Sequence, residues 1–245
     1  MDIYLDTAVL DEIRAAKSWG VLRGVTTNPS HVAKAGVKDL KAHIQEICYI
    51  ADAPVSAEVV TEDSEEMVRQ GLEYADWSPN VVVKIPTIPA GLQAIAQLTK
   101  QRTAASCSGC AHFTGCPIRE RFIQTNTLEK NPEVNATLIF SANQAILALA
   151  SGASYVSPFV GRLDAIGEDG LLLVADIAEI LKAQHQGGKI IAAALRHPVH
   201  VTAVARLGAQ IATMAFPLLK QMVEHPLTER GLADFMADYE RSRQQ

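Results

Sequence analysis

The chain has 245 residues, of which 48% are hydrophobic and 20% are charged, and its formal net charge is −5. This composition is typical of a globular protein with a sizeable core, and the negative charge gives no global basic field for binding nucleic acid. No apolar run approaches the roughly 20 residues needed to cross a bilayer, and the N-terminus lacks the order of a signal peptide. We therefore expect no membrane partner and a cytoplasmic location.

Short apolar runs alternate with longer helical patterns along almost the whole sequence. The runs that predict buried strands are residues 3–6, 24–27, 55–60, 81–85, 136–140, 155–159, 190–195 and 209–215. The segments with helical periodicity are residues 10–17, 37–49, 64–74, 90–100, 141–150, 171–184, 200–207, 217–223 and 228–242.

This alternation predicts parallel strands joined by right-handed crossovers. Eight such units in about 250 residues is the size of a (β/α)8 TIM barrel, which is our expected α/β fold. A doubly wound open sheet is the alternative, although no Gly-rich dinucleotide fingerprint follows any strand. We expect one barrel domain over residues 1–225, a Cys-containing insertion at 101–134 before the fifth strand, and a C-terminal helical tail at 226–245.

Lys84 lies at the end of an otherwise unbroken apolar run. Burying an ammonium group without a partner is costly, and desolvated lysines form Schiff bases with carbonyl substrates. The alternative is that Lys84 only ends the strand and reaches into water past Pro86. The barrel favours the catalytic interpretation, because active sites collect where barrel strands end and further polar residues stand there. These residues are Asp6, Thr27, Asn28, Glu58, Asn135, Thr137, Ser157, Arg196 and, slightly later, Arg162.

This set of side chains predicts carbonyl chemistry on an anionic substrate. An amine would condense with a ketone, and the protonated imine would act as an electron sink for carbon–carbon cleavage. Asp6 and Glu58 are the carboxylates at the strand ends, so they are the candidates for proton transfer. Arg162 and Arg196 carry planar cations suited to a phosphate group, although either could instead form a surface ion pair. His197 stands beside this phosphate site, whereas the other histidines show no ligand spacing.

Five sequence blocks resemble the transaldolase family, which includes the fructose-6-phosphate aldolases. The blocks are YLDT at 4–7, GVTTNPS at 24–30, VVKIP at 82–86, NATLIFS at 135–141 and YVSPFVGRLD at 155–164. They occur in the family's order and cover most of the chain up to about residue 225. The resemblance implies a TIM barrel that moves a dihydroxyacetone unit from a ketose phosphate, such as sedoheptulose 7-phosphate or fructose 6-phosphate, to an aldose phosphate. It also implies a place in the pentose phosphate pathway and no required metal or organic cofactor.

The resemblance assigns a role to each block. Lys84 would form the Schiff base, Asp6 would act as acid and base on the substrate hydroxyl, and Glu58 with Thr137 would hold a proton-relaying water. The implied substrate contacts are Asn28, Asn135 and Ser157 for hydroxyls or the imine, and Arg162 and Arg196 for phosphate. Small members of the family form pentameric rings that pair into decamers through a C-terminal helix, so a homo-oligomer is expected.

Two positions favour a transferase over an aldolase that releases dihydroxyacetone. Family aldolases carry glutamine where Glu58 stands and tyrosine where Phe159 stands. One position departs from both groups, because Ala194 replaces a serine that would help to bind phosphate. An alternative from another class is a weakly active barrel whose Cys-rich insertion binds a metal or a partner.

The insertion at 101–134 contains Cys107, Cys110, His112 and Cys116. This spacing fits zinc or an iron–sulfur centre, although a flexible surface segment with reactive thiols is the alternative. The charged run 119–121 predicts a solvated helix face. Because the insertion joins a helix to a strand, we expect it at the amino-terminal face of the barrel, away from Lys84, in a structural, regulatory or assembly role.

Overall fold

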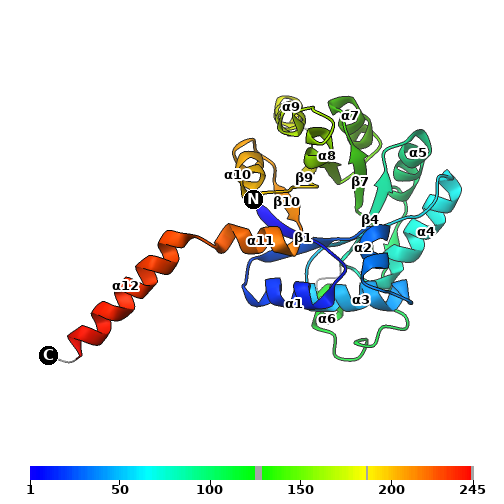
Figure 1. The fold of residues 1–245 in the computed structure, drawn as a ribbon. Helices are drawn as coiled ribbons and strands as arrows, with labels where there is room; N and C mark the ends of the chain where they lie inside the picture. The colour runs from blue at the N-terminus through cyan, green and yellow to red at the C-terminus, as the bar shows by residue number, and fades with distance from the viewer. Residues whose placement is uncertain (125–128, 186, 244–245) are drawn as a thin grey trace.

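The computed structural model describes residues 1–124, 129–185 and 187–243. Within them, parallel strands close into a barrel in the order β1-β10-β9-β8-β7-β4-β3-β2 (Figure 1). The barrel strands are β1 (Asp2–Asp6), β2 (Leu22–Thr26), β3 (Val55–Glu58), β4 (Val81–Pro86), β7 (Val134–Ile139), β8 (Tyr155–Pro158), β9 (Lys189–Ala192) and β10 (Ile211–Met214). The predicted (β/α)8 barrel is confirmed.

Helices surround the barrel. They are α1 (Leu10–Ser18), α2 (Pro29–Lys34), α3 (Leu40–Ala51), α4 (Ser64–Trp77), α5 (Pro89–Leu98), α7 (Ala142–Ala150), α8 (Val160–Asp164), α9 (Gly170–Gln184), α10 (Pro198–Arg206) and α11 (Phe216–Val223). Asp39, Asp63 and Ser141 each cap a helix by accepting a first-turn backbone N–H, which contributes about 1 kcal/mol per cap. The short helices α2 and α8 follow β2 and β8 directly, so they lie at the carboxyl ends of the strands.

Side chains on β4 alternate between the helix layer and the barrel interior, because successive residues of a strand face opposite sides. Val81, Val83 and Ile85 belong to the large core beneath the helices, whereas Val82 belongs to a separate apolar cluster inside the barrel. Lys84 shares the face of Val82. The strand therefore directs the lysine side chain into the barrel and not toward the helices.

The floor of the barrel interior is an apolar cluster. Its members are Tyr4, Val82, Tyr155, Ile191 and Ile211. Gly24 of β2 leaves room for this floor, since a Cβ there would lie 2.3 Å from the Tyr4 ring. Two residues further along four of these strands, on the same face, the side chains are Asp6, Lys84, Ser157 and Thr213. The period of two thus places a polar layer directly above the apolar floor, toward the carboxyl ends.

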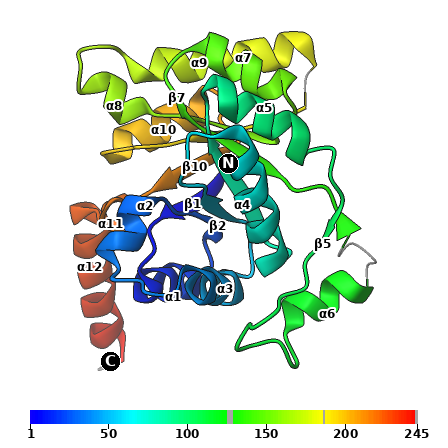
Figure 2. The same cartoon turned by 90° about the vertical axis from the view of Figure 1, so that its right-hand side faces the viewer.

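The insertion forms β5 (Thr103–Ala104), β6 (Glu129–Lys130) and α6 (Pro117–Gln124). The two strands pair antiparallel, outside the barrel. Figure 2 shows this segment beside α3 and α4, on the side where it leaves α5 and returns to β7. Because β7 begins at Val134, the insertion lies at the amino-terminal face, as the sequence predicted.

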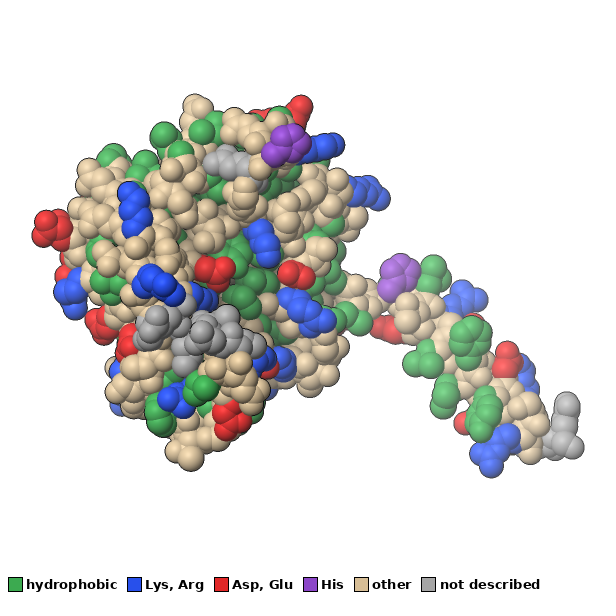
Figure 3. Space-filling view, turned by 180° about the vertical axis from the view of Figure 1, so that it is seen from behind, with side chains coloured by type: hydrophobic (Ala, Val, Ile, Leu, Met, Phe, Trp, Pro, Cys, Tyr) green, Lys and Arg blue, Asp and Glu red, His purple; other side chains and the backbone are tan. Residues whose placement is uncertain are grey.

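The C-terminal helix α12 (Pro226–Ser242) projects away from the barrel (Figure 1). In the space-filling view its hydrophobic side chains lie uncovered along the projecting arm (Figure 3). The exposed large side chains are Leu227, Leu232, Phe235, Met236 and Tyr239. Over the described ranges 1–124, 129–185 and 187–243, α12 and the other helices lack the length and apolar character needed to cross a bilayer.

Candidate active site

Lys84 is 4% exposed, and its ammonium group is held by two oxygens at the carboxyl ends of the strands. Nζ lies 2.9 Å from Glu58 Oε2 and donates a hydrogen bond of 3.1 Å to the carbonyl oxygen of Thr27. The sequence argument identified the burial of an unpartnered ammonium as costly and named Glu58 as a candidate for proton transfer. In the structure Glu58, from the neighbouring strand, supplies the compensating charge.

Asp6 ends β1 beside a small group of polar side chains. Thr26 Oγ1 donates a hydrogen bond of 2.7 Å to Asp6 Oδ1 and lies 2.6 Å from Thr213 Oγ1. His31 Nδ1 lies 3.5 Å from the same carboxylate oxygen. Since Thr26 and Thr27 are consecutive residues, β2 connects the group around Asp6 with the group around Lys84.

A second polar group lies on the opposite side of Lys84, where β4 pairs with β7. Asn135 is fully buried, and it donates to Ser56 Oγ at 3.1 Å and accepts from Ser157 Oγ at 2.7 Å. Thr137 is also fully buried, yet its Oγ1 has no hydrogen-bond partner among the residues that the structure describes. A buried hydroxyl without a partner is uncommon and calls for an explanation.

Asn28 and Phe159 are the N-cap residues that immediately precede the short rim helices α2 and α8. The Asn28 side chain caps α2 by accepting a hydrogen bond of 2.9 Å from the His31 backbone, so its Oδ1 has a structural partner. The Phe159 ring packs edge-on against Phe140, with 5.8 Å between the centroids, and the Arg162 guanidinium lies 5.3 Å from the Phe159 centroid. The rim near Phe159 is therefore apolar with a cation above it.

The two arginines proposed for phosphate stand on adjacent rim segments. Arg162 and Arg196 are both exposed. Arg196 packs over Gly161, where an added Cβ would lie 2.8 Å from the Arg196 Nε and 2.3 Å from the Ala194 carbonyl oxygen. Ala194 has φ +57°, and this left-handed conformation ends β9 earlier than the predicted limit of residue 195. Gly161 thus leaves room for the Arg196 side chain and the Ala194 carbonyl, which a side chain at 161 would meet.

His200 lies under the same rim. Its ring centroid lies 3.6 Å from that of His197, with the two rings tilted by 46°, and its Nε2 lies 3.3 Å from Asp164 Oδ2. Burial lowers the pKa of His200 from 6.5, and repulsion from His197 adds to this, while Asp164 acts in the opposite direction. The imidazole is therefore stabilised in its neutral form.

Sequence reasoning missed four polar residues that complete the site. They are Thr26, His31, Ser56 and Thr213. His31 lacks any ligand or triad spacing, so no motif marks it. Its position in the sequence could have identified it, since a residue shortly after the end of a barrel strand lies at the active-site face.

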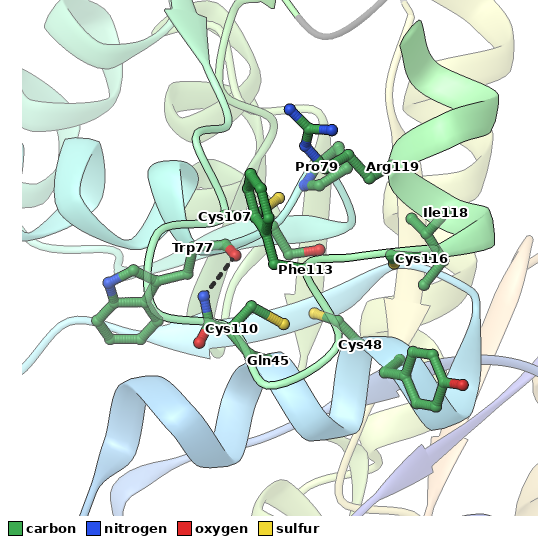
Figure 4. A pocket seen from close by; sticks show the side chains of 12 residues that line it. Gln45, Cys48, Trp77, Pro79, Cys107, Cys110, Phe113, Cys116, Ile118 and Arg119 are labelled. Carbon is green, nitrogen blue, oxygen red and sulfur yellow. Dashed lines mark hydrogen bonds between the residues drawn. The ribbon is translucent and has the colours of Figure 1, made fainter. Parts of the chain in front are cut away.

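The metal ligand set expected in the insertion does not form. His112 Nε2 lies 2.6 Å from Glu46 Oε2, and its ring stacks on Tyr49 at 3.6 Å. Across residues 1–124, 129–185 and 187–243, no three His, Cys, Asp or Glu side chains are grouped closely enough to hold one metal ion. The insertion thiols instead line a cavity with Cys48 of α3 (Figure 4).

Burial governs the chemistry of these thiols. All four cysteines are free. Burial raises the pKa of Cys48 to about 12 and that of Cys107 to about 11, and in both cases the neighbouring cysteines add to the increase. Thiols held in their neutral form are weak nucleophiles, so Cys48 and Cys107 are poorly suited to act as reactive thiols.

The fold and the rim define an α/β barrel enzyme centred on a buried lysine amine. A family model described as transaldolase/fructose-6-phosphate aldolase matches residues 3–245. The chain is 46% identical over 241 residues to a probable transaldolase of Moorella thermoacetica, with 98% of each chain covered. It is 45% identical over 239 residues to one of Roseiflexus castenholzii, covering 98% of this chain and 97% of the relative.

A solved structure from Coccidioides immitis, a candidate fructose-1,6-biphosphate aldolase, covers 86% of this chain and 72% of its own with a TM-score of 0.51. Its 12% identity shows a shared barrel fold alone. The sequence comparisons carry more weight because they extend over nearly the whole chain. The protein belongs to the transaldolase/fructose-6-phosphate aldolase family, and it is an enzyme of the transaldolase type.

Proposed function

We propose that the enzyme transfers a dihydroxyacetone unit from a ketose phosphate to an aldose phosphate through a Schiff base on Lys84. The observation that carries this proposal is the contact between Lys84 Nζ and Glu58 Oε2, at 2.9 Å on the interior face of the barrel. A lysine reacts with a ketone only as the neutral amine, so it must lose a proton first. Of its two oxygen partners, only the carboxylate is basic enough to accept that proton.

The first half of the reaction forms the imine. Glu58 accepts a proton from Lys84, and Nζ then attacks the carbonyl carbon of the ketose. A carbon–nitrogen bond forms, and the carbonyl oxygen leaves as water after receiving protons. Thr137 supports this step, since its buried Oγ1 has no partner among the described protein groups and is suited to hold a water for the proton transfer.

Asp6 drives the cleavage step. Its carboxylate removes the proton from the hydroxyl next to the breaking carbon–carbon bond, and the bond electrons move to the imine nitrogen. The hydrogen bond from Thr26 and the approach of His31 occupy Oδ1, which leaves Oδ2 to face the substrate. The released aldose is replaced by an acceptor aldose phosphate, and the same steps in reverse complete the transfer.

The remaining rim residues bind the substrate. Asn135 and Ser157 are joined by a hydrogen bond and present polar atoms beside the imine, and Asn28 contacts a substrate hydroxyl from its cap position. Arg162 and Arg196 bind the phosphate group as exposed cations on adjacent rim segments. The reaction requires no metal or organic cofactor and belongs to the pentose phosphate pathway in the cytoplasm.

A lyase that releases free dihydroxyacetone is the second candidate. Release requires a water positioned to protonate the enamine after cleavage. Phe159 offers no hydroxyl for this purpose and packs against Phe140 in an apolar corner. This observation favours transfer over release. The two activities are separated by measuring fructose 6-phosphate consumption with and without an acceptor aldose phosphate, and a rate independent of acceptor would support the lyase.

The assembly is proposed to be a homo-oligomer formed through α12. The helix projects from the barrel with uncovered apolar side chains, and a second copy of the chain would bury them (Figure 3). A pentamer or a decamer is expected from the family. Analytical ultracentrifugation of the full chain and of a variant lacking residues 226–245 tests this. The same number of chains per particle in both proteins would contradict it.

Borohydride trapping tests the Schiff base directly. Reduction in the presence of fructose 6-phosphate converts the imine into a stable amine, so a peptide containing Lys84 should gain the mass of a reduced three-carbon adduct. A Lys84→Met variant should gain no mass, whereas a variant of the surface residue Lys182 should be labelled as the wild type is. A labelled peptide elsewhere in the chain would overturn the proposed lysine.

A further inference from the structure

All four cysteines of the chain line one small cavity, although they come from distant parts of the sequence (Figure 4). Cys48 belongs to α3 of the barrel, and Cys107, Cys110 and Cys116 belong to the insertion. Four soft thiol ligands, two of them in Cys-x2-Cys spacing, match the donor set of a closed structural zinc site.

The insertion is fixed against the barrel on both sides of this cavity. The backbone N–H of Cys107 donates to the Asp76 carbonyl at 3.0 Å, and Ser106 contacts the Asp76 carboxylate through its backbone and its hydroxyl. Beyond the cysteines, Arg121 forms an ion pair of 2.8 Å with Asp52. The insertion is therefore held against α4 through Asp76 and against the end of α3 through Asp52, by contacts that do not involve sulfur.

A tight turn joins the first two cysteines. Cys110 N–H donates to the Cys107 carbonyl at 3.1 Å, and Gly109 has φ +74°, which closes a tight turn. Cys-x2-Cys spacing is typical of zinc sites. Cys107 Sγ donates here to the Ala105 carbonyl at 3.8 Å, so its side chain has to rotate before both sulfurs can bind one ion. Cys107 itself has φ +54°, a costly conformation for a residue with a side chain, and its hydrogen bond to Asp76 keeps it there.

An independent feature of the same cavity indicates an anionic occupant. The sequence predicted Arg119 as part of a solvated helix face, yet its Nε is buried and has no hydrogen-bond partner among the described residues. The guanidinium lies 4.4 Å from the Phe113 ring centroid and lines the cavity with the thiols. A zinc ion bound by four thiolates carries a net charge of −2, which a neighbouring guanidinium would offset by charge and by N–H donation to sulfur.

We propose that Cys48, Cys107, Cys110 and Cys116 bind one zinc ion that fastens the insertion to α3. The cavity volume of ≈ 20 Å³ is that of one water-sized sphere, which suits a single ion and not a four-iron cluster. The sulfurs line the cavity without converging on one point, so binding requires rotation of their side chains. Each thiol releases its proton to water as its sulfur binds Zn²⁺, and no oxidant or reductant is needed.

This site is separate from the reaction at Lys84. The cavity is lined by Ser78 and Pro79, which precede β4, so it opens at the amino ends of the strands, opposite the active site. Its role is structural, because four protein thiolates leave no open position for a substrate. His112 is excluded from the ligand set by its contacts with Glu46 and Tyr49.

Elemental analysis of the purified full chain tests the proposal, with about one zinc and no iron per chain expected. Cys48→Ser should lower the zinc content at least tenfold, whereas the matched variant His112→Ala should keep the wild-type content. Far-ultraviolet circular dichroism checks that both variants are folded. If Cys48→Ser does not fold, Co²⁺ titration of the wild type decides, because four thiolates give an intense sulfur-to-cobalt charge-transfer band and tetrahedral ligand-field bands.

Three results would overturn the zinc site. The first is wild-type protein that contains no zinc and takes up neither Zn²⁺ nor Co²⁺. The second is loss of zinc in His112→Ala with retention in Cys48→Ser, which would restore the histidine-containing set. The third is a full count of reactive thiols in the presence of Zn²⁺, since coordinated sulfurs should react with a disulfide reagent far more slowly than after chelation.

Discussion

Glu58 and Lys84 are paired directly in the register of β3 and β4, and their side chains meet at 2.9 Å between Oε2 and Nζ. The register of the two strands therefore places the partners side by side, since paired residues of neighbouring strands extend to the same face. The Glu58 and Lys84 side chains are 13% and 5% exposed. At this burial, losing one partner leaves a costly uncompensated charge, and the pair holds the amine in one position.

Replacing the carboxylate of Glu58 should slow the formation of the imine. Glu58→Gln keeps the shape and the hydrogen-bond acceptor but removes the proton acceptor, so we expect kcat to fall by roughly 10²–10⁴-fold. Steady-state kinetics with fructose 6-phosphate and an acceptor measure this, and the borohydride trapping rate should fall in parallel. The exposed Glu62→Gln is the matched control. Wild-type trapping in Glu58→Gln would show that another group deprotonates the lysine.

Adding a hydroxyl at Phe159 should shift the enzyme toward release of dihydroxyacetone. Phe159→Tyr would place a hydroxyl at the rim, where it can orient a water toward the enamine. We expect cleavage of fructose 6-phosphate without acceptor to rise at least about tenfold relative to transfer, a change of about 1.4 kcal/mol in barrier difference. Phe140→Tyr, on the other ring of the edge-on pair, is the control. An equal ratio of acceptor-independent cleavage to transfer in both variants would show that Phe159 does not determine the choice between transfer and release.

The barrel and the central site could be predicted because they follow from periodicity. In β4, the alternation that turns Val82 inward also turns Lys84 inward, and both facts are readable from the sequence. The ion-pair partner of Lys84 was harder to predict from the sequence, since its pairing with Glu58 depends on the register between two strands. The contact of His31 with Asp6, and the cavity that Cys48 shares with the insertion thiols, depend on tertiary packing of distant segments and leave no spacing signal.

Restoring a serine at 194 should strengthen phosphate binding. Ala194→Ser adds a donor to the rim segment that carries Arg196, and a hydrogen bond to a charged group contributes about 1.5–3 kcal/mol, or roughly a tenfold or greater fall in KM for a sugar phosphate. Ala194→Gly is the control, because it relieves the left-handed φ of +57° and stabilises the fold by about 1 kcal/mol without adding a donor. An unchanged KM in the serine variant would mean that the position does not contact phosphate.

His200 should make the stability of the fold depend on pH. Burial and His197 lower its folded pKa below 6.5, so the unfolded chain binds a proton first as the pH falls. Stability contributed by the neutral imidazole is therefore present above pH 6.5 and is lost as the pH falls from there toward the folded pKa. Urea unfolding at about pH 7.5 and about pH 5.5 measures this loss, which should be smaller in His200→Gln. Substitution of the exposed His225 should leave the difference in the free energy of unfolding between the two pH values as it is in the wild type.

Thr137 separates a catalytic role from a structural one. Thr137→Val removes a buried hydroxyl that has no partner within the described protein, so the free energy of unfolding should stay the same or rise by about 1 kcal/mol. If Oγ1 holds the proton-relaying water, kcat should nevertheless fall by roughly 10²-fold or more. Thr87→Val is the matched control, because Thr87 Oγ1 donates to the Thr137 carbonyl at 2.8 Å. That variant should lose stability by about 1 kcal/mol through the lost hydrogen bond. Retained activity in Thr137→Val would remove the hydroxyl from the mechanism, since its loss cannot be compensated by an isosteric methyl group.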